Sequence, residues 1–426
     1  MESHKVLIIG SGGRESALAW KISQSRFCEK LFIAPGNAGT SFLGQNVEIP
    51  VLDFIAIRDL ILSKKISIVI VGPEAPLVKG LHDFLINEIK KDNFIIIGPK
   101  KNGATLEGSK EFAKEFMFRH RIPTARYRIF NKKNIHEANA FLNTLNPPYV
   151  LKADGLAAGK GVIILNDLNE AKKSLENMIL KKKFGQASER VVIEEYLKGT
   201  EVSSFVLTDG DSYKIFPMAK DYKRIGVGDT GLNTGGMGAI SPVPFVDKKL
   251  YYKIEDQVIR PTINGLKKDK IDYIGFLFIG LMIVENEPHV IEYNVRLGDP
   301  ETEAILPRIE SDLLEIFLQL KSSQLQTANI KVSDLFSSTV MIVSKGYPEK
   351  YEKGKIISGL DSKNDSFIFH SGTKKQSQDI VTSGGRVIAV TSTDKFLDKA
   401  LEKSYKTISK IQFEGKTFRN DIGFDF

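Results

Sequence analysis

Cysteine is nearly absent from this 426-residue chain, in which Cys28 stands alone. One thiol can form neither a disulfide within the chain nor a thiolate metal cluster, so a disulfide-stapled domain and a cysteine zinc site are both excluded. Glu2, His4 and Lys5 interrupt any apolar run at the N-terminus, where a secretory leader would need one. We therefore expect a protein of the reducing cytoplasm.

Long apolar runs are also missing. The longest one, at 273–284, is broken by glycines and is shorter than the roughly 18 residues that cross a membrane. Hydrophobic residues make up 42% and charged residues 26% of the chain, a balance typical of globular proteins and not of disordered chains or fibres. A chain of this length predicts several domains and no membrane partner.

A strong excess of one charge is lacking as well. The chain has 60 basic and 52 acidic residues, a net charge of +8. Much of the excess is lysine scattered along the chain, as at 181–183, which indicates solvated surface. Because basic and aromatic residues do not interleave, we expect no nucleic-acid partner. The positive balance could still attract anionic small molecules.

The first hundred residues alternate short β-branched runs with segments of helical periodicity. This pattern is typical of a doubly wound parallel α/β domain, which binds ligands at the carboxyl ends of its strands. Several runs end in Gly or Gly-Pro, as such strand ends often do. We expect this domain at 1–103. Its predicted strands are 6–9, 31–34, 67–71 and 94–97, and its predicted helices are 14–25, 53–62 and 81–90.

The pattern becomes α+β after residue 103. One helix is expected at 104–120, and the glycine-rich stretch 221–241 is expected to be a long loop that acts as a lid or binding segment. We expect a central domain at 104–325, with a lid subdomain at about 124–196, and a small α+β domain at 326–426. Further strands are predicted at 127–130, 149–153, 162–165, 191–196, 201–207, 213–218, 276–284, 289–295, 340–343, 355–357, 367–370 and 385–391, with helices at 312–321 and 395–410.

The turn Gly10–Glu15 follows a strand and opens a helix. It departs from the dinucleotide fingerprint because Glu15 takes the third glycine position and the next strand ends without an acidic residue. The pattern favours a turn whose backbone amides bind a phosphate, with charge added by Arg14. A second such loop is expected at Gly36–Thr40. The alternative is that both are tight turns without a ligand.

A second glycine-rich loop, Lys152–Val162, begins and ends on a strand and lacks the Walker order. Such a loop can fold over nucleotide phosphates with Lys152 beneath it, and the alternative is a plain hairpin. Farther along, Glu194–Leu197 ends a strand whose free backbone groups suit an adenine edge. Glu201 could accept hydrogen bonds from ribose hydroxyls, and the alternative there is an ordinary strand end.

Three polar side chains are predicted to share one face of a strand, since Glu292, Asn294 and Arg296 are spaced two apart. One carboxylate and one amide oxygen suit Mg²⁺, which keeps waters and bridges phosphate oxygens. An arginine beside them can hold an anionic substrate. The alternative, a solvated polar face, is disfavoured by the apolar strands around it.

Taken together, eight runs resemble the glycinamide ribonucleotide synthetases, the phosphoribosylamine–glycine ligase family of the ATP-grasp superfamily. The resemblance extends from Lys5 to about Gly423. It implies an N-terminal phosphoribosylamine domain, a central ATP-grasp fold of two α+β subdomains and a C-terminal domain. The runs are Gly10–Ala19, Ala34–Thr40, Val71–Gly80, Leu106–Lys110, Lys152–Val162, Asp229–Gly238, Gly298–Thr302 and Ser383–Val387.

The resemblance implies ligation of glycine to 5-phosphoribosylamine, giving glycinamide ribonucleotide, in de novo purine (IMP) biosynthesis. ATP would be cleaved to ADP and phosphate by way of glycyl phosphate. The partners would be these three small molecules, and we expect a monomer, with a weak dimer as the alternative. The rival hypotheses are an ATP-grasp carboxylase that uses bicarbonate and a nucleotide-sensing protein without turnover.

The resemblance also implies roles for individual residues, among them a metal pair for Mg²⁺ or Mn²⁺. Gly280 stands where many ATP-grasp enzymes have a further carboxylate, and Ser11 and Ser16 replace the family's usual Asn and His. The implied roles are catalysis by Lys152 and Arg296; ATP binding by Lys110, Lys152, Gly155, Gly159, Lys160, Gly161, Glu194, Glu195, Tyr196, Leu197 and Glu201; substrate binding by Gly12, Gly13, Arg14, Gly36, Asn37, Gly39, Thr40, Pro73, Glu74, Asp221, Arg296 and Asp299; and metal binding by Glu292 and Asn294.

Overall fold

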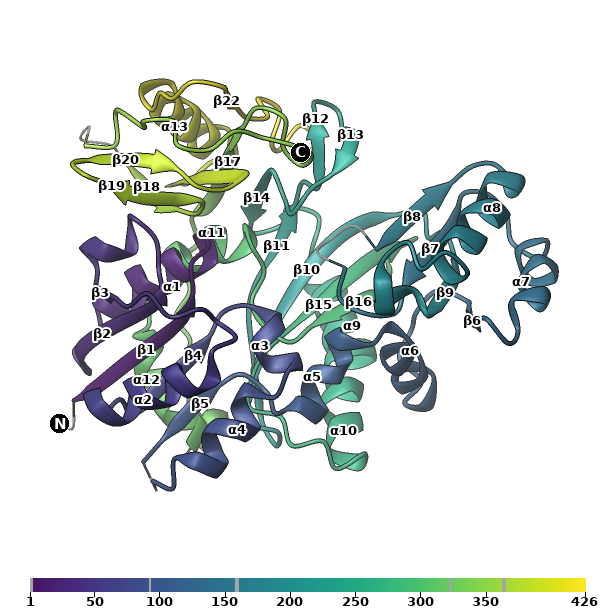
Figure 1. Cartoon of the computed structure of the whole chain (residues 1–426), viewed down its shortest axis with the longest axis horizontal. Coiled ribbons are helices and arrows are strands. Elements are labelled where there is room, and N and C mark those ends of the chain that lie inside the picture. The colour runs from purple at the N-terminus through teal and green to yellow at the C-terminus, as the bar shows by residue number, and fades with distance from the viewer. Residues whose placement is uncertain (1–2, 92, 158–160, 322–323, 362–364) are drawn as a thin grey trace.

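The first domain is a five-stranded parallel sheet with helices on both faces. A computed structural model describes residues 3–91, 93–157, 161–321, 324–361 and 365–426 of the chain (Figure 1). The strand order β3-β2-β1-β4-β5 reverses direction beside β1, which confirms the predicted doubly wound topology. The strands are β1 (His4–Gly10), β2 (Cys28–Pro35), β3 (Gln45–Asn46), β4 (Ile68–Val71) and β5 (Ile95–Ile97).

Alternation along β1 divides the core between the two faces of this sheet. Leu7 and Ile9 belong to one apolar cluster, and Val6 and Ile8 to another, all of them fully buried. One face is covered by α2 (Phe54–Lys64) and α4 (Leu81–Glu88), and the other by α1 (Gly13–Ser23) and α12 (Leu313–Lys321). Helix α12 therefore completes the first sheet from far along the chain.

The helix expected at 104–120 is two helices, α5 (Lys101–Gly108) and α6 (Lys110–Arg119). Ser109 between them has extended backbone angles, and its hydroxyl accepts a hydrogen bond from the N–H of Phe112 at 3.1 Å. Serine is a favoured N-cap because its oxygen satisfies an amide that the helix itself leaves unpaired. The break places Lys110 in the first turn of α6.

A separate antiparallel sheet of order β6-β9-β7-β8 stands apart from the rest of the molecule (Figure 1). Two helices, α7 (Ile135–Leu142) and α8 (Leu168–Ile179), pack on it and give it an apolar core of its own. We call this body the lid. Its strands are β6 (Tyr127–Asn131), β7 (Tyr149–Ala153), β8 (Val162–Leu165) and β9 (Arg190–Glu195).

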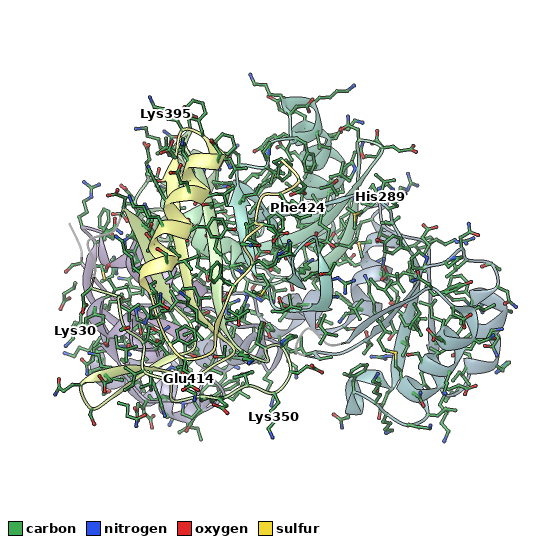
Figure 2. All side chains as sticks on the ribbon, turned by 90° about the horizontal axis from the view of Figure 1, so that it is seen from above. Lys30, His289, Lys350, Lys395, Glu414 and Phe424 are labelled. Carbon is green, nitrogen blue, oxygen red and sulfur yellow. The ribbon has the colours of Figure 1, made fainter. Side chains whose placement is uncertain are left out.

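One nine-stranded sheet runs from the centre of the chain into its last hundred residues. The order is β16-β15-β10-β11-β14-β17-β21-β18, and β22 (Lys416–Thr417) pairs with β17. Helix α13 (Leu397–Lys410) packs on β17 and β21, and from above this region covers the first domain (Figure 2). The other strands are β10 (Thr200–Thr208), β11 (Tyr213–Asp221), β14 (Gly238–Ser241), β15 (Gly275–Val284), β16 (Glu287–Asn294), β17 (Phe336–Ser344), β18 (Ser366–His370) and β21 (Arg386–Asp394).

The expectation of an unstructured loop at 221–241 is wrong. The segment holds a hairpin of β12 (Arg224–Gly226) and β13 (Thr230–Asn233), followed by β14, which pairs with both β11 and β17. Sheet ladders use backbone groups, so glycines do not prevent pairing. Gly238 is needed in β14, because a Cβ atom there would lie 2.7 Å from the carbonyl oxygen of Thr339.

Two smaller differences lie near the C-terminus. The strand expected at 355–357 is reduced to a bridge between Ile356 and Val381. An unpredicted hairpin is formed by β19 (Thr373–Gln376) and β20 (Asp379–Thr382). Among the helices of the described ranges, none is long and apolar enough to span a membrane.

Candidate active site

The start of α6 is fixed to the end of lid strand β7. Asp154 Oδ1 accepts hydrogen bonds from the Ser109 hydroxyl (2.9 Å) and the Glu111 N–H (2.8 Å). The Lys110 ammonium consequently lies 3.5 Å from the carbonyl oxygen of Gly155, at the base of the glycine-rich loop. Burial lowers the pKa of Lys110. The predicted phosphate lysine is thus placed beside the predicted flap.

The base of that flap is defined by two glycines. The N–H of Gly155 donates to the carbonyl of Ala187 at 3.2 Å, and the carbonyl of Gly161 accepts from the N–H of Ala153 at 2.8 Å. The second bond closes the hairpin between β7 and β8, and the first ties the loop to the turn that precedes β9. Two predicted ATP contacts, Gly159 and Lys160, lie outside the described residues.

Lys152 belongs to a buried group of three charged side chains. Its Nζ lies 3.0 Å from Oε2 of Glu194 and donates to the carbonyl of Ile291 at 3.1 Å. The other carboxylate oxygen of Glu194 lies 3.2 Å from Nζ of Lys114, a residue that the sequence did not single out. Burial lowers the pKa of Lys114 to about 8. Burial alone would raise the pKa of Glu194, but the two lysines hold it below its usual value.

Two of the four neighbouring residues predicted to surround adenosine, Glu194 and Glu195, already have their carboxylates bound within the chain. The carboxylate of Glu194 is enclosed by lysines, and Oε1 of Glu195 accepts the N–H of Arg126 at 2.7 Å, as at an ordinary strand end. Tyr196 and Leu197 lie in the connection from β9 to β10, where Tyr196 is exposed.

The predicted metal pair lies on β16. The register places Gly280 opposite Glu292, and a Cβ on that glycine would lie 3.0 Å from Cγ of the glutamate. Burial opposes ionisation of Glu292, yet the positive charges of Lys223, Lys152 and Lys110 hold its pKa below the usual value. Three lysines from three other segments therefore stabilise the ionised form of Glu292.

The donor chemistry of Glu292 and Asn294 fits a divalent ion. A carboxylate and an amide oxygen are ligands that Mg²⁺ accepts when waters and phosphate oxygens complete its shell. Among the described residues, the side-chain nitrogen of Asn294 is buried without a hydrogen-bond partner, and its oxygen accepts a 3.3 Å bond from Arg296 alone. In the described ranges no three His, Cys, Asp or Glu side chains are grouped to hold a metal by themselves.

Asp221 and Lys223 add a second charged group at the end of β11. Burial, together with the charges of Glu301, Glu201 and Glu292, raises the pKa of Asp221 to about 8. Lys223 Nζ lies 3.9 Å from the Asp221 carboxylate and forms an ion pair with Glu201, the predicted ribose contact. The sequence missed Lys223, although its place two residues after Asp221 was a usable signal.

Arg296 joins three elements. Its Nε lies 3.2 Å from Oε2 of Glu74, which follows Pro73 at the start of α3 (Glu74–Val78), and its Nη2 lies 2.9 Å from Oε1 of Glu107 on α5. Glu107 also accepts the N–H of Val295 at 2.7 Å, and burial raises its pKa to about 7. Two carboxylates thus already partner the predicted substrate arginine.

The glycine turn before α1 is filled by the chain's own carboxylates. A Cβ on Gly13 would collide with Oε1 of Glu303, and the N–H of Arg14 donates to Oδ2 of Asp299 at 3.2 Å. The Arg14 side chain is buried, with Nε 2.6 Å from Oε1 of Glu15. Arg14, which the sequence predicts to add charge for a phosphate, is thus already paired with Glu15. An anion site at this helix end is already occupied by Asp299.

The second predicted loop is held together by Asn37. Its Oδ1 accepts the N–H groups of Gly39 (2.9 Å) and Thr40 (3.0 Å), and its Nδ2 donates to the carbonyls of Ser11 (2.9 Å) and His370 (2.8 Å). Thr40 is fully buried, and a Cβ on Gly39 would collide with the His370 ring. The loop thus binds the last domain through its own residues.

A cleft of about 500 Å³ opens between the first and last domains. Arg386 reaches across its floor: Nη1 donates to the carbonyls of Gly235 and Asp299 at 2.6 Å each, and Nη2 lies 3.0 Å from Oδ1 of Asp299. Although Asp299 is buried, Arg386 and Arg14 lower its pKa. The cleft is lined by Ser11, Gly12, Pro35, Gly36 and Asn37 and by Tyr347, Ser371, Gly372, Thr373, Lys374, Ser383, Gly384 and Arg386.

Comparison with known proteins gives matches along nearly the whole chain. Sequence models of phosphoribosylglycinamide synthetase match as its N domain at residues 4–107, its ATP-grasp (A) domain at 108–302 and its C domain at 337–425. The chain is 44% identical to a phosphoribosylamine–glycine ligase of Chlorobaculum tepidum, covering 98% of this chain and 99% of the relative.

Solved structures agree with these matches. A crystal structure of the phosphoribosylamine–glycine ligase of Thermotoga maritima has a TM-score of 0.85 and 34% identity, covering 98% of this chain and 99% of that one. The biotin carboxylase domain of Hydrogenobacter thermophilus 2-oxoglutarate carboxylase, solved with MgADP, ADP and bicarbonate, has a TM-score of 0.73 over 98% and 92% of the two chains. At 15% identity that second likeness shows a shared fold alone.

Proposed function

The chain belongs to the phosphoribosylglycinamide synthetase family, and we propose that its ATP-dependent ligation of glycine to 5-phosphoribosylamine takes place between the lid and the large sheet, around Lys152 and Glu292. The observation that carries this placement is that Lys152 Nζ donates to the carbonyl of Ile291, the residue before Glu292, while the charges of Lys223, Lys152 and Lys110 lower the pKa of Glu292. Phosphoryl transfer needs positioned positive charge more than it needs a nucleophilic side chain.

The proposed reaction has two steps. The glycine carboxylate attacks the γ-phosphorus of ATP, so that a new O–P bond forms while the bond to ADP breaks and glycyl phosphate results. The amine of phosphoribosylamine then attacks the acyl carbon, the C–O bond to phosphate breaks, and the amine gives up one proton. The lid would exclude water from the acyl phosphate, which otherwise hydrolyses.

The nucleotide roles follow the geometry of the site. Lys110 and Lys152 would neutralise the ATP phosphates, and the loop at 155–161 would cover them. The adenosine would lie along the connection at 194–197. Glu292 and Asn294 would hold Mg²⁺ or Mn²⁺, which supplies charge neutralisation when bound. Support for the nucleotide comes from the shared fold of the carboxylase domain solved with MgADP.

For glycine, the candidates remain Asp221, Arg296 and Asp299. All three lie among opposite charges, since Asp221 is near Lys223, Arg296 bridges two glutamates and Asp299 is paired with Arg386. Glycine carries an ammonium group and a carboxylate group. Each of these groups could take the place of one of the charged partners just named. Glycine would then lie between the ATP phosphates and the cleft.

Phosphoribosylamine is proposed to occupy the cleft between the first and last domains. Gly12, Gly36 and Asn37, three of the predicted substrate contacts, line the cleft, and its positive charges come from the last domain, as Lys374 and Arg386. Because Arg386 is bound to Asp299, Lys374 is the side chain available for the substrate's phosphate. The substrate's amine would then lie toward Asp299.

Replacing Lys374 with methionine is expected to raise the KM for phosphoribosylamine about tenfold, the value of one charge-assisted contact. The KM values for ATP and glycine should stay unchanged in steady-state ADP release. Lys375→Met is the matched control, because the next residue of a strand faces the other way and Lys375 Nζ lies 4.6 Å from the ring centre of Phe42. Equal effects of the two substitutions would contradict this placement of the phosphate.

A coupled ADP-release assay tests the reaction itself. Release is expected only when ATP, glycine and phosphoribosylamine are all present, and bicarbonate should not replace either acceptor. Release with bicarbonate would favour the carboxylase hypothesis, and binding of ATP without any release would favour a sensor. The proposal also retains a monomer, and it retains a cytoplasmic location, which the single cysteine favours.

A further inference from the structure

Lys114 is a buried charge that the proposed reaction does not use. Its side chain is 2% exposed, and that of its carboxylate partner Glu194 is 3% exposed. Burying an ion pair is seldom better for stability than packing apolar groups in the same space, because both charges lose their water. A lysine kept in such a place therefore calls for a reason beyond packing.

The contacts of Lys114 lead to the strand that carries Glu292. Its Nζ donates to the hydroxyl of Thr124 at 2.7 Å, and that hydroxyl donates to the carbonyl of Val290 at 2.6 Å. Lys152 donates to the carbonyl of the next residue, Ile291. The two lysines are thus tied to consecutive carbonyls of β16 and are joined to each other through the two oxygens of Glu194.

Helix α6 gives Lys114 a direct relation to the proposed phosphate site. Lys110 and Lys114 are four residues apart and lie on one face of the helix. Lys110 is at the flap, and Lys114, one turn farther along the helix, contacts the same carboxylate as Lys152. The same helix therefore supplies one lysine for the nucleotide and one for the carboxylate that Lys152 contacts.

Lys114 changes the net charge of the buried group that it forms with Glu194 and Lys152. Glu194 and Lys152 alone would form a neutral pair. With Lys114 the group carries one net positive charge, and each lysine takes a separate oxygen of the carboxylate. The Lys152 side chain is 11% exposed, against 2% for Lys114. The net positive charge of the group can therefore act on a ligand through Lys152.

We propose that Lys114 is a positioning residue for ATP, which takes one oxygen of Glu194 so that Lys152 keeps both its place and its positive charge for the phosphates. This inference rests on the proposed role of Lys152. It makes Glu194 a shared support of two lysines, in addition to any contact of its backbone with the nucleotide.

Lys114→Met is expected to raise the KM for ATP at least tenfold and to weaken MgATP binding in calorimetry by the same factor. The KM values for glycine and phosphoribosylamine should change less than twofold. Arg119→Met is the matched control, because Arg119 is a half-exposed positively charged residue on the same helix and pairs with Asp269 at the surface. ATP binding to that variant should equal that of the unchanged chain.

A double substitution separates charge from packing. In Lys114→Met/Glu194→Gln the carboxylate is removed too, so Lys152 again carries an uncompensated positive charge. ATP binding should recover at least threefold relative to Lys114→Met. A purely structural role for Lys114 predicts that the double variant binds ATP as weakly as the single one or more weakly, and this result would overturn the proposal.

Two further variants, Lys114→Gln and Lys152→Met, test the fold of the first variant and the phosphate site separately. If Lys114→Met fails to fold, as judged by thermal unfolding, Lys114→Gln repeats the test, because its amide can still donate to Thr124 but carries no charge. Unchanged ATP binding in a folded Lys114 variant refutes the inference. Unchanged ATP binding in Lys152→Met would instead refute the proposed phosphate site on which the inference rests.

Discussion

Replacing Glu292 with alanine is expected to lower kcat about 10²-fold or more while the chain still folds. The charges of Lys223, Lys152 and Lys110 lower the pKa of Glu292, which is the charged member of the proposed metal pair. Its loss would remove an ion ligand and one negative charge from the surroundings of Lys110, Lys152 and Lys223. The rate of ADP release at saturating substrates measures the effect, and thermal unfolding reports the fold.

Glu287→Ala is the matched control for this substitution. Glu287 begins the same strand, is about half exposed and pairs with Lys253 at the surface. Its removal should leave kcat unchanged, because exposed ion pairs contribute little to stability and Glu287 lies five residues before Glu292 along β16. Turnover of Glu292→Ala within threefold of normal would remove Glu292 from the metal role.

Lys152→Met is expected to lower kcat/KM for ATP about 10³-fold. Two losses combine: one positive contact to the phosphates disappears, and the remaining pair of Lys114 and Glu194 is neutral. Steady-state ADP release with varied ATP gives the value, and calorimetry with MgATP shows how much of it is binding.

Lys173→Met controls for removal of a lysine from the lid, since Lys173 is exposed on α8. Its ATP parameters should match those of the unchanged chain. A fall of less than tenfold in Lys152→Met would mean that the phosphates lie elsewhere. Recovery by Lys152→Met/Glu194→Gln is not expected, because no ammonium then remains at that position.

Local pattern was enough to predict the first domain and the strand bearing Glu292. Short β-branched runs such as 6–9 and 68–71 are typical of buried parallel strands. Period-two spacing placed Glu292 and Asn294 on one face of their strand. The resemblance then identified the family. The strand signals lie within a few neighbouring residues, and the resemblance adds up eight such local runs along the chain.

Contacts between distant segments could not be predicted in that way. The pairing of Lys114 with Glu194 joins residues 80 positions apart, so neither neighbourhood contains it. Lys374 reaches the cleft only because the last domain packs over the first. Glycine content suggested a loop at 221–241, although backbone pairing, which composition does not record, makes β14 a central strand.

The uninterrupted ladder from β16 to β18 bears on how this enzyme could be re-engineered. Exchanging the last domain for that of another organism would mean cutting between β14 and β17, where Gly238–Ser241 pairs with Ser337–Val340. Each half would then present an open strand edge, which invites pairing with foreign chains. A chimera therefore has to carry both strands of that seam from one parent, with the junction placed in a turn.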